Sequence, residues 1–406
     1  MTVSAVHEIR SQFPSLSRVH RGHPVAYFDG PGGTQVPRPV VEAMSDYLYH
    51  HNANTHWAYP TSEETDALLA AARVTVAEFL NGRPDEIAFG QNMTSLTFHL
   101  ARGLGRAWGP GDEIVVTELD HHGNVAPWRA LATDRGLTVR TVRMRVEDGT
   151  LDWSDLERQL GPRTRLLAIG AASNALGTIS DIRAATALAH THGALAFVDA
   201  VHYAPHQLVD VQAIGCDFLA CSAYKFYGPH IGILWGRREL IEATDVPRLD
   251  PAPQESPERM ETGTQSHEAI VGAAAAVDFL ADLAPDVAGG RRAALAAAYA
   301  ELHRRGEALF AQLWSTLETI PGLTLFGPRP GQPRTPTLSF VIKGKHTTDI
   351  ARQLAAEGLF VSNGDFYAAT VIERLGQVPD GVVRIGASAY STADEIERLT
   401  SRLRGI

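Results

Sequence analysis

Largely apolar runs that alternate with helical patterns are the feature that most limits how this chain folds. The runs are residues 87–90, 113–117, 166–170, 194–199, 218–222 and 232–235. Apolar segments of this length are typical of strands that are covered on both faces. Helical patterns separate several of them, at 63–80, 124–135 and 182–192. The alternation predicts an α/β fold with a mostly parallel sheet and helices on both sides.

The last third of the chain has a different character. A proline-rich connection at 247–257 is followed by mostly helical sequence at 270–317, with a break between Pro285 and Gly290. Beyond it, the expected elements are strands at 337–342 and 382–386, a helix at 347–357 and a closing C-terminal helix.

The length of 406 residues exceeds what one compact domain normally holds. We therefore divide the chain into an N-terminal segment 1–25, a large cofactor-binding domain 26–270 and a small α+β domain 271–406.

Composition excludes several classes of protein. The formal net charge is −10, and no basic stripe suggests a nucleic-acid partner. The apolar runs are too short to cross a membrane, and residues 1–14 do not resemble a secretory signal. Only Cys216 and Cys221 are present, which argues against a disulfide framework and favours a cytoplasmic location.

A carboxylate and a lysine follow two successive predicted strands. Asp199 ends one strand, and Lys225 lies just beyond the next. Ligands of open α/β sheets bind outside the carboxyl ends of the strands, so both side chains are expected at the binding edge. A buried lysine amine is partly neutral and can form an imine with a pyridine aldehyde, while a carboxylate keeps the ring nitrogen protonated. An aspartate and a lysine at such positions are, in most proteins, a helix-capping aspartate and a surface lysine. Here the neighbouring motifs favour a site for pyridoxal phosphate (PLP).

Other polar residues fall at the same predicted edge. Thr94 lies where a strand meets a helix, a position suited to phosphate, and Ser222 adds a second hydroxyl. Asn174 is placed to approach a phenolic oxygen, and His121 to lie over a ring. We expect no metal site, because the histidine pairs lack a third partner with ligand spacing, and no nucleotide loop is present.

The motifs resemble those of the class V aminotransferase family, in the branch of cysteine desulfurases and selenocysteine lyases. The segments that carry the resemblance are Tyr27-Phe-Asp-Gly-Pro-Gly-Gly-Thr-Gln-Val-Pro37, 118–128, 173–178, 199–210 and 222–229. The resemblance runs from about residue 25 to the C-terminus. It implies the PLP-dependent fold type I (aspartate-aminotransferase-like), with a seven-stranded large-domain sheet, and a homodimer with the active site at the subunit interface.

The resemblance also implies roles for individual residues. Lys225 would carry PLP as a Schiff base and move protons, Asp199 would pair with the ring nitrogen, and Arg384 would bind the substrate carboxylate. The other cofactor contacts that we expect are Met93, Thr94, His121 (which is also expected to act in catalysis), Asn174, Ser222 and, on the phosphate of the neighbouring subunit, Thr264. Asn54 and Gly33 are expected at the substrate.

This sequence departs from the desulfurases at several positions. His202 stands where they carry glutamine near the phenolic oxygen, and Tyr224 replaces the histidine before the lysine; both remain candidate cofactor contacts. Tyr367 lies near the position of their catalytic cysteine, and no cysteine follows Cys221. Persulfide chemistry is therefore not expected, and Tyr367 is either a second acid that faces the substrate or an aromatic filler.

The leading hypothesis is a PLP-dependent lyase that eliminates the β-sulfur of a cysteine derivative. Transamination, epimerisation and decarboxylation with deamination would use the same residues and are the alternatives within the family. A PLP-fold protein that binds without catalysis is the alternative of another class. The presence of both Lys225 and Asp199 argues against it, because such proteins typically lose one of the two.

Overall fold

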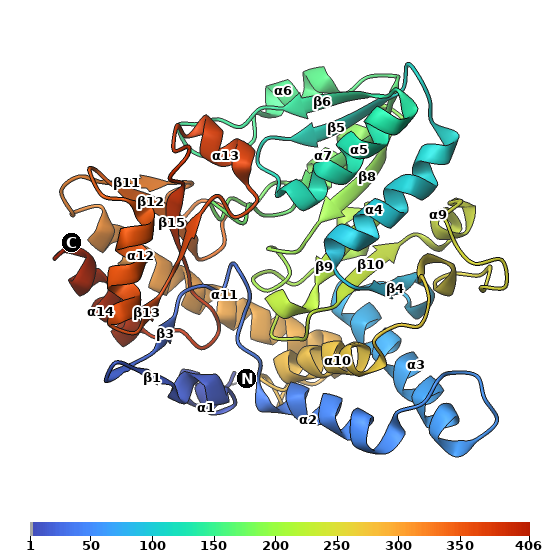
Figure 1. Cartoon of the computed structure of the whole chain (residues 1–406), viewed down its shortest axis with the longest axis horizontal. Coiled ribbons are helices and arrows are strands. Elements are labelled where there is room, and N and C mark those ends of the chain that lie inside the picture. The colour runs from blue at the N-terminus through green and yellow to red at the C-terminus, as the bar shows by residue number, and fades with distance from the viewer. Residues whose placement is uncertain (1–2) are drawn as a thin grey trace.

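The computed structural model describes residues 3–406, which contain two main sheets (Figure 1). The larger has seven strands in the order β4-β10-β9-β8-β7-β5-β6. Their bounds are β4 Ile87–Gly90, β5 Glu113–Thr117, β6 Thr138–Val142, β7 Thr164–Gly170, β8 Leu195–Asp199, β9 Phe218–Ser222 and β10 Gly232–Gly236. Strand β10 runs antiparallel to both of its neighbours, while β9, β8, β7, β5 and β6 are mutually parallel. The prediction of a mostly parallel seven-stranded sheet is confirmed.

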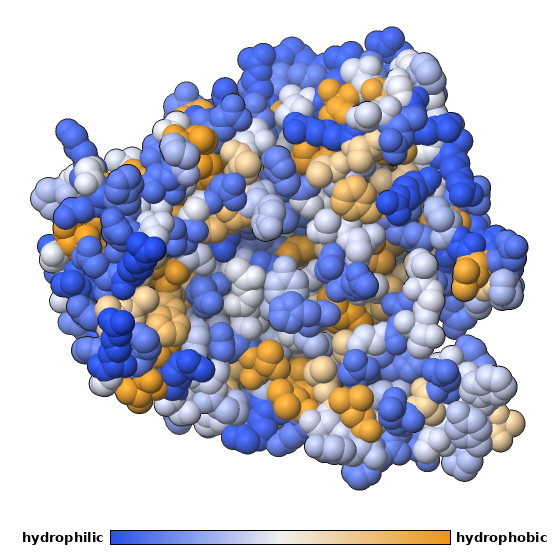
Figure 2. All heavy atoms as spheres, in the orientation of Figure 1, coloured by the Kyte–Doolittle hydropathy of each residue, from blue (hydrophilic) through white to orange (hydrophobic). Residues whose placement is uncertain are grey.

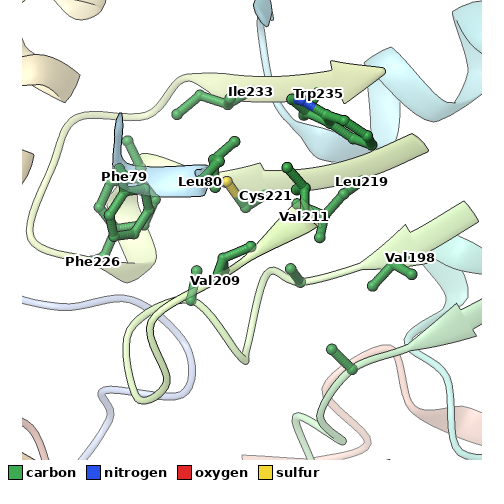
Figure 3. Packing of buried hydrophobic residues seen from close by; sticks show 14 of the residues in the cluster. Phe79, Leu80, Val198, Val209, Val211, Leu219, Cys221, Phe226, Ile233 and Trp235 are labelled. Carbon is green, nitrogen blue, oxygen red and sulfur yellow. The ribbon is translucent and has the colours of Figure 1, made fainter. Parts of the chain in front are cut away.

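Consecutive strand residues point to opposite faces, and each face packs on its own helices. On one face, Val115 joins a cluster with side chains of α3 Pro60–Leu80, α7 Ile182–Thr191 and α10 His267–Ala281. On the other, Ile114 and Val116 pack with α4 Met93–Leu104 and α5 Ala126–Arg135. Figure 3 shows part of the first cluster, in which Phe79, Leu80 and Phe226 lie near Cys221 and the strands. Burial of both faces explains why these strands are apolar throughout.

The second sheet has the antiparallel order β11-β12-β15-β14. Its strands are β11 Leu323–Phe326, β12 Thr337–Ile342, β14 Ser362–Gly364 and β15 Val382–Gly386. It packs with α12 Thr347–Ala356, α14 Ala393–Leu403 and the end of α11 Gly290–Leu317. Near the N-terminus, β3 Ala26–Tyr27 pairs with β13 Leu359–Phe360, which brings the start of the chain beside this sheet (Figure 1).

Helix α11 packs against both main sheets. Its first half, with Leu295 and Tyr299, joins the core of the seven-stranded sheet, and its second half, with Phe310 and Trp314, joins the core of the smaller sheet. Helix α10 packs against α3 and against α2 Arg38–Asp46, beside the larger sheet. The division near residue 270 stays a prediction.

Short elements complete the fold. They are α1 Val6–Ser11, β1 Val19–His20, β2 His23–Pro24, α6 Trp153–Gln159, α8 Val211–Ile214, α9 Arg238–Ala243 and α13 Ala369–Arg374. Among residues 3–406, no helix has both the length and the apolar character needed to cross a membrane.

Candidate active site

A cavity of about 700 Å³ opens at the carboxyl ends of the parallel strands. It lies between the two sheets, where the space-filling view is hollowed near its middle (Figure 2). The candidate residues that line it are Met93, Thr94, His121, Asn174, Asp199, His202, Ser222, Tyr224, Lys225, Tyr367 and Arg384. Strand ends of the larger sheet supply most of them, whereas Arg384 comes from β15 of the smaller sheet.

Lys225 is buried just beyond β9, in a short helical turn. Its Nζ donates hydrogen bonds to the carbonyl oxygens of Gly32, at 3.0 Å, and Pro31. Burial, reinforced by the positive charge of Arg384 and opposed by Asp199, lowers the pKa of Lys225 to about 7. A substantial share of this amine is therefore neutral near neutral pH, as attack on an aldehyde requires.

Asp199 ends β8 and is also buried. Its Oδ1 accepts a hydrogen bond from the backbone N–H of Val201 at 2.9 Å. Burial raises the pKa of Asp199 to about 6, against the lowering effects of this hydrogen bond and of Lys225. A cationic ring nitrogen placed beside this carboxylate would stabilise its charged form.

A second buried carboxyl, Asp120, lies beside Asp199 and was not predicted from the sequence. Gly170 is the register partner of Asp199 in the neighbouring strand, and its N–H donates to Asp120 Oδ1. A side chain at position 170 would overlap this oxygen, so the glycine makes room for the carboxyl. Burial and the charge of Asp199 hold the pKa of Asp120 well above its usual range. The signal was an aspartate directly before His121, shortly after a predicted strand.

Two neutral imidazoles line the cavity. Burial, with smaller effects of nearby cations led by Lys225, lowers the pKa of His121 to about 4, and its Nδ1 accepts from the N–H of Gly123 at 2.9 Å. Burial also holds the pKa of His202 well below its usual range. His202 Nε2 lies 3.1 Å from the hydroxyls of both Thr335 and Thr337, so it is held from the smaller sheet.

The N-terminus of α4 forms another part of the wall. Met93 and Thr94 are its first two residues, and the N–H of Met93 donates to the hydroxyl of Ser222 at 3.1 Å. A Cβ at Gly123 would lie 2.8 Å from Thr94 Oγ1, so the backbone of the His121 turn approaches this hydroxyl closely. Backbone N–H groups and hydroxyls at a helix N-terminus suit a phosphate.

Arg384 and Asn174 form the opposite wall. Arg384 Nη1 donates to the backbone oxygen of Asn174 at 2.9 Å, and the guanidinium carbon lies 3.9 Å from the ring centroid of Phe366. Burial lowers the pKa of Arg384 to about 9, with Asp29 opposing. Arg384 Nε and Asn174 Oδ1 are buried without a hydrogen-bond partner among the described residues, which is typical of a site prepared for a ligand.

Three predicted residues do not line the cavity within this chain. Asn54 and Thr264 are exposed on loops, and Gly33 instead approaches the ring of Tyr224, where a Cβ would lie 3.3 Å from it. Sequence reasoning also overlooked Phe366 and His230, which do line it. Their signal was weak, because an aromatic residue in a loop has no fixed spacing to a motif.

Comparison with known proteins agrees with this geometry. The family model described as "Aminotransferase class-V" matches residues 26–399. A cysteine desulfurase of Pectobacterium carotovorum is 33% identical over 99% of this chain and 98% of its own length. The solved structure of a cysteine desulfurase from Thermococcus onnurineus is similar with a TM-score of 0.90 and 28% identity, covering 100% of this chain and 99% of that one. The solved structure of a cysteine desulfurase from Escherichia coli is similar with a TM-score of 0.86 and 27% identity, covering 99% of this chain and 98% of that one.

The chain belongs to the class V aminotransferases, which are PLP-dependent enzymes of fold type I. The residues fit this cofactor. The cavity has the size of a small-molecule site and is lined by a partly neutral lysine and a buried carboxyl, and Asn174 Oδ1 is buried with no hydrogen-bond partner in residues 3–406. The expectations of fold, family and cofactor are confirmed.

Proposed function

We propose that this enzyme cleaves the bond between Cβ and sulfur of a cysteine derivative and releases the sulfur as a free thiol. The observation that carries the proposal is a cavity that fits PLP and has a buried arginine, Arg384, but no thiol on its walls. Cys216 and Cys221 are both buried, neither lines the cavity, and burial raises the pKa of each thiol. Figure 3 shows Cys221 among apolar side chains.

PLP, when bound, supplies an electron sink for negative charge at the substrate Cα. Lys225 would hold the cofactor covalently, and Asp199 would pair with its ring nitrogen. Thr94, Ser222 and the N–H of Met93 would hold its phosphate. These assignments are supported by where the residues lie in the cavity wall. Met93 and Thr94 begin α4, Ser222 ends β9 and Asp199 ends β8, and all of them line the same cavity as Lys225.

Other side chains would orient the ring. His121, which is neutral, would lie against its face, and Asn174, with His202 and Tyr224 nearby, would approach its phenolic oxygen. The partner subunit's Thr264 would complete the phosphate site, which is consistent with the exposure of this residue in the single chain.

Arg384 would bind the substrate carboxylate in two-point geometry, since a planar guanidinium matches a carboxylate. The freed Lys225 amine would then take the α-proton. The Cβ–S bond would break with its electron pair on sulfur, the thiolate would take the proton from the Lys225 ammonium and leave as a thiol, and water would hydrolyse the released 2-aminoacrylate to pyruvate and ammonia. No protein sulfur is needed as an acceptor.

The test is release of pyruvate, ammonia and thiol from S-substituted cysteines by the purified holoenzyme. We expect equimolar products, and no activity in Lys225→Ala. A Cys216→Ala, Cys221→Ala double variant should retain full activity. If that variant loses turnover with its fold intact, or if no cysteine derivative is a substrate, the proposal is wrong.

We further propose a cytoplasmic homodimer. The segment between α2 and α3 exposes a run of large side chains that a monomer would leave in water. Their exposed fractions are 49% for Leu48, 81% for Tyr49, 60% for Trp57 and 45% for Tyr59. Asn54 lies in the same segment, so an interface here would also explain why it does not reach the cavity of its own chain. Light scattering of the wild type and of Tyr49→Asp tests this assignment.

A further inference from the structure

The turn that replaces the cysteine-bearing segment has an unusual backbone. Phe366 and Tyr367 are consecutive residues with φ of +57° and +55°, in the left-handed region that side chains other than glycine rarely adopt. The turn lies between β14 and α13, at the edge of the smaller sheet. Strain of this kind persists only where surrounding interactions determine it, and such positions gather at functional sites.

Two hydrogen bonds fix the turn against the cofactor site, and a third lies within the turn itself. The side-chain amide of Asn174 donates to the carbonyl oxygen of Phe366 at 3.0 Å, and the N–H of His122 donates to that of Tyr367 at 2.7 Å. Asp365 Oδ1 accepts from the N–H of Tyr367 at 2.9 Å. Both carbonyls of the strained pair are therefore held by loops of the seven-stranded sheet, which fixes the backbone from which the two aromatic side chains project.

The two rings occupy different positions on the cavity wall. Phe366 covers one face of the Arg384 guanidinium, and the Nε edge, which has no hydrogen-bond partner among residues 3–406, stays available to a carboxylate. Tyr367 lies next along the chain, with its ring centroid 5.6 Å from that of His121, and it is 73% exposed. Lys225, Arg384, His121 and Tyr367 all line the same cavity, so an amino acid held by the first two would have its side chain in the space that the two rings also border.

We propose that the Phe366–Tyr367 turn is an aromatic subsite that selects cysteine conjugates with an aromatic group on sulfur. This inference rests on the proposed function and names its substrate class. A flat apolar substituent would pack against the Tyr367 ring and remove its exposed surface from water, whereas cysteine itself is too short to do so. An aromatic thiolate is also a good leaving group, so the same substituent would assist cleavage of the Cβ–S bond.

Binding can be measured apart from chemistry with unreactive isosteres. L-homophenylalanine has a methylene in place of the sulfur of S-phenylcysteine, and L-norvaline is the matching isostere of S-methylcysteine. Dissociation constants follow from the change in cofactor absorbance of the holoenzyme. We expect homophenylalanine to bind on the order of tenfold more tightly than norvaline.

Variants test whether the preference for homophenylalanine over norvaline depends on the ring of Tyr367. Tyr367→Asn removes the ring while asparagine tolerates the left-handed backbone, and it should reduce the preference to about twofold or less. Tyr367→Phe should keep the preference, because only the hydroxyl is lost. Trp153→Ala, which removes an exposed aromatic residue that does not line the cavity, is the matched control and should leave both constants unchanged.

The outcomes separate the subsite from the proposed reaction. If homophenylalanine is preferred through Tyr367 but S-phenylcysteine yields no pyruvate, the subsite stands and the lyase assignment falls. Equal affinities for the two isosteres, or a preference that survives Tyr367→Asn, would overturn the subsite even where cysteine derivatives are cleaved. The subsite is also overturned if Tyr367→Asn changes only the oligomeric state.

Discussion

Replacement of Lys225 by methionine in the cofactor-free protein should reveal how strongly burial disfavours its charge. The pKa of this amine falls from 10.5 to about 7 on folding. The unfolded chain therefore binds a proton more readily than the folded one between these values, so stability rises with pH across this window. At about pH 7 the buried amine destabilises the folded protein by about 4 kcal/mol, and at about pH 10 by about 1 kcal/mol.

Lys225→Met removes this dependence. It also leaves the carbonyls of Pro31 and Gly32 without their donor, which costs about 1 to 3 kcal/mol for each buried group. Because carbonyls do not titrate, that loss is the same at every pH. The difference in stability between variant and wild type should therefore shift by about 3 kcal/mol between about pH 7 and about pH 10.

The assay is calorimetric unfolding of both proteins without PLP. With an unfolding entropy of about 2.1 cal/mol/K per residue, 3 kcal/mol corresponds to about 4 °C in the midpoint of this chain. The chain has only three lysines, and Lys343 is exposed, so Lys343→Met is the control and should show no such shift. A difference between Lys225→Met and wild type that does not change with pH would refute the burial argument.

Three further predictions concern the walls of the cavity. Asp120→Asn should stabilise the cofactor-free protein at neutral pH, measured by calorimetry, because it removes a carboxyl whose charge is disfavoured by burial and by Asp199. Because folding raises the pKa of Asp120, this gain should shrink as the pH falls towards about 4. Gly123→Ala puts a methyl 2.8 Å from Thr94 Oγ1 and should weaken PLP binding about tenfold in a fluorescence titration, whereas Gly161→Ala, with open space around it, should not. Arg384→Lys should weaken the binding of amino acids by about tenfold to hundredfold, measured by cofactor absorbance, while PLP affinity is kept.

The parts of the site that lie at strand ends could be predicted from the sequence. Asp199 and Ser222 end buried strands and Lys225 lies just beyond one of them; the apolar runs of these strands are easy to recognise, and parallel strands bring their carboxyl ends to one edge. Strand β6 escaped this reasoning. It lies at the sheet edge, is partly exposed, and has three polar residues among its five, so it lacks a continuous apolar run.

The Phe366–Tyr367 turn could not be predicted, for a different physical reason. Left-handed backbone is usually signalled by glycine or asparagine, and neither stands at these two positions. Their conformation is imposed by hydrogen bonds from Asn174 and His122, which are almost 200 and more than 200 residues away in the sequence. Interactions between such distant segments are set by tertiary packing and have no local pattern.

The charges around Lys225 explain why one arginine can serve both binding and proton transfer. Burial and, to a smaller extent, the charge of Arg384 lower the pKa of Lys225, and both effects help to keep the amine neutral for attack on the cofactor. A substrate carboxylate bound to Arg384 would cancel that charge, and the freed amine would become more basic when it has to take the α-proton. Arg384 would thus bind the amino acid and also adjust the pKa of Lys225, the base that reacts with it. Both effects arise from the charge of Arg384, which acts strongly over short distances inside a buried cavity.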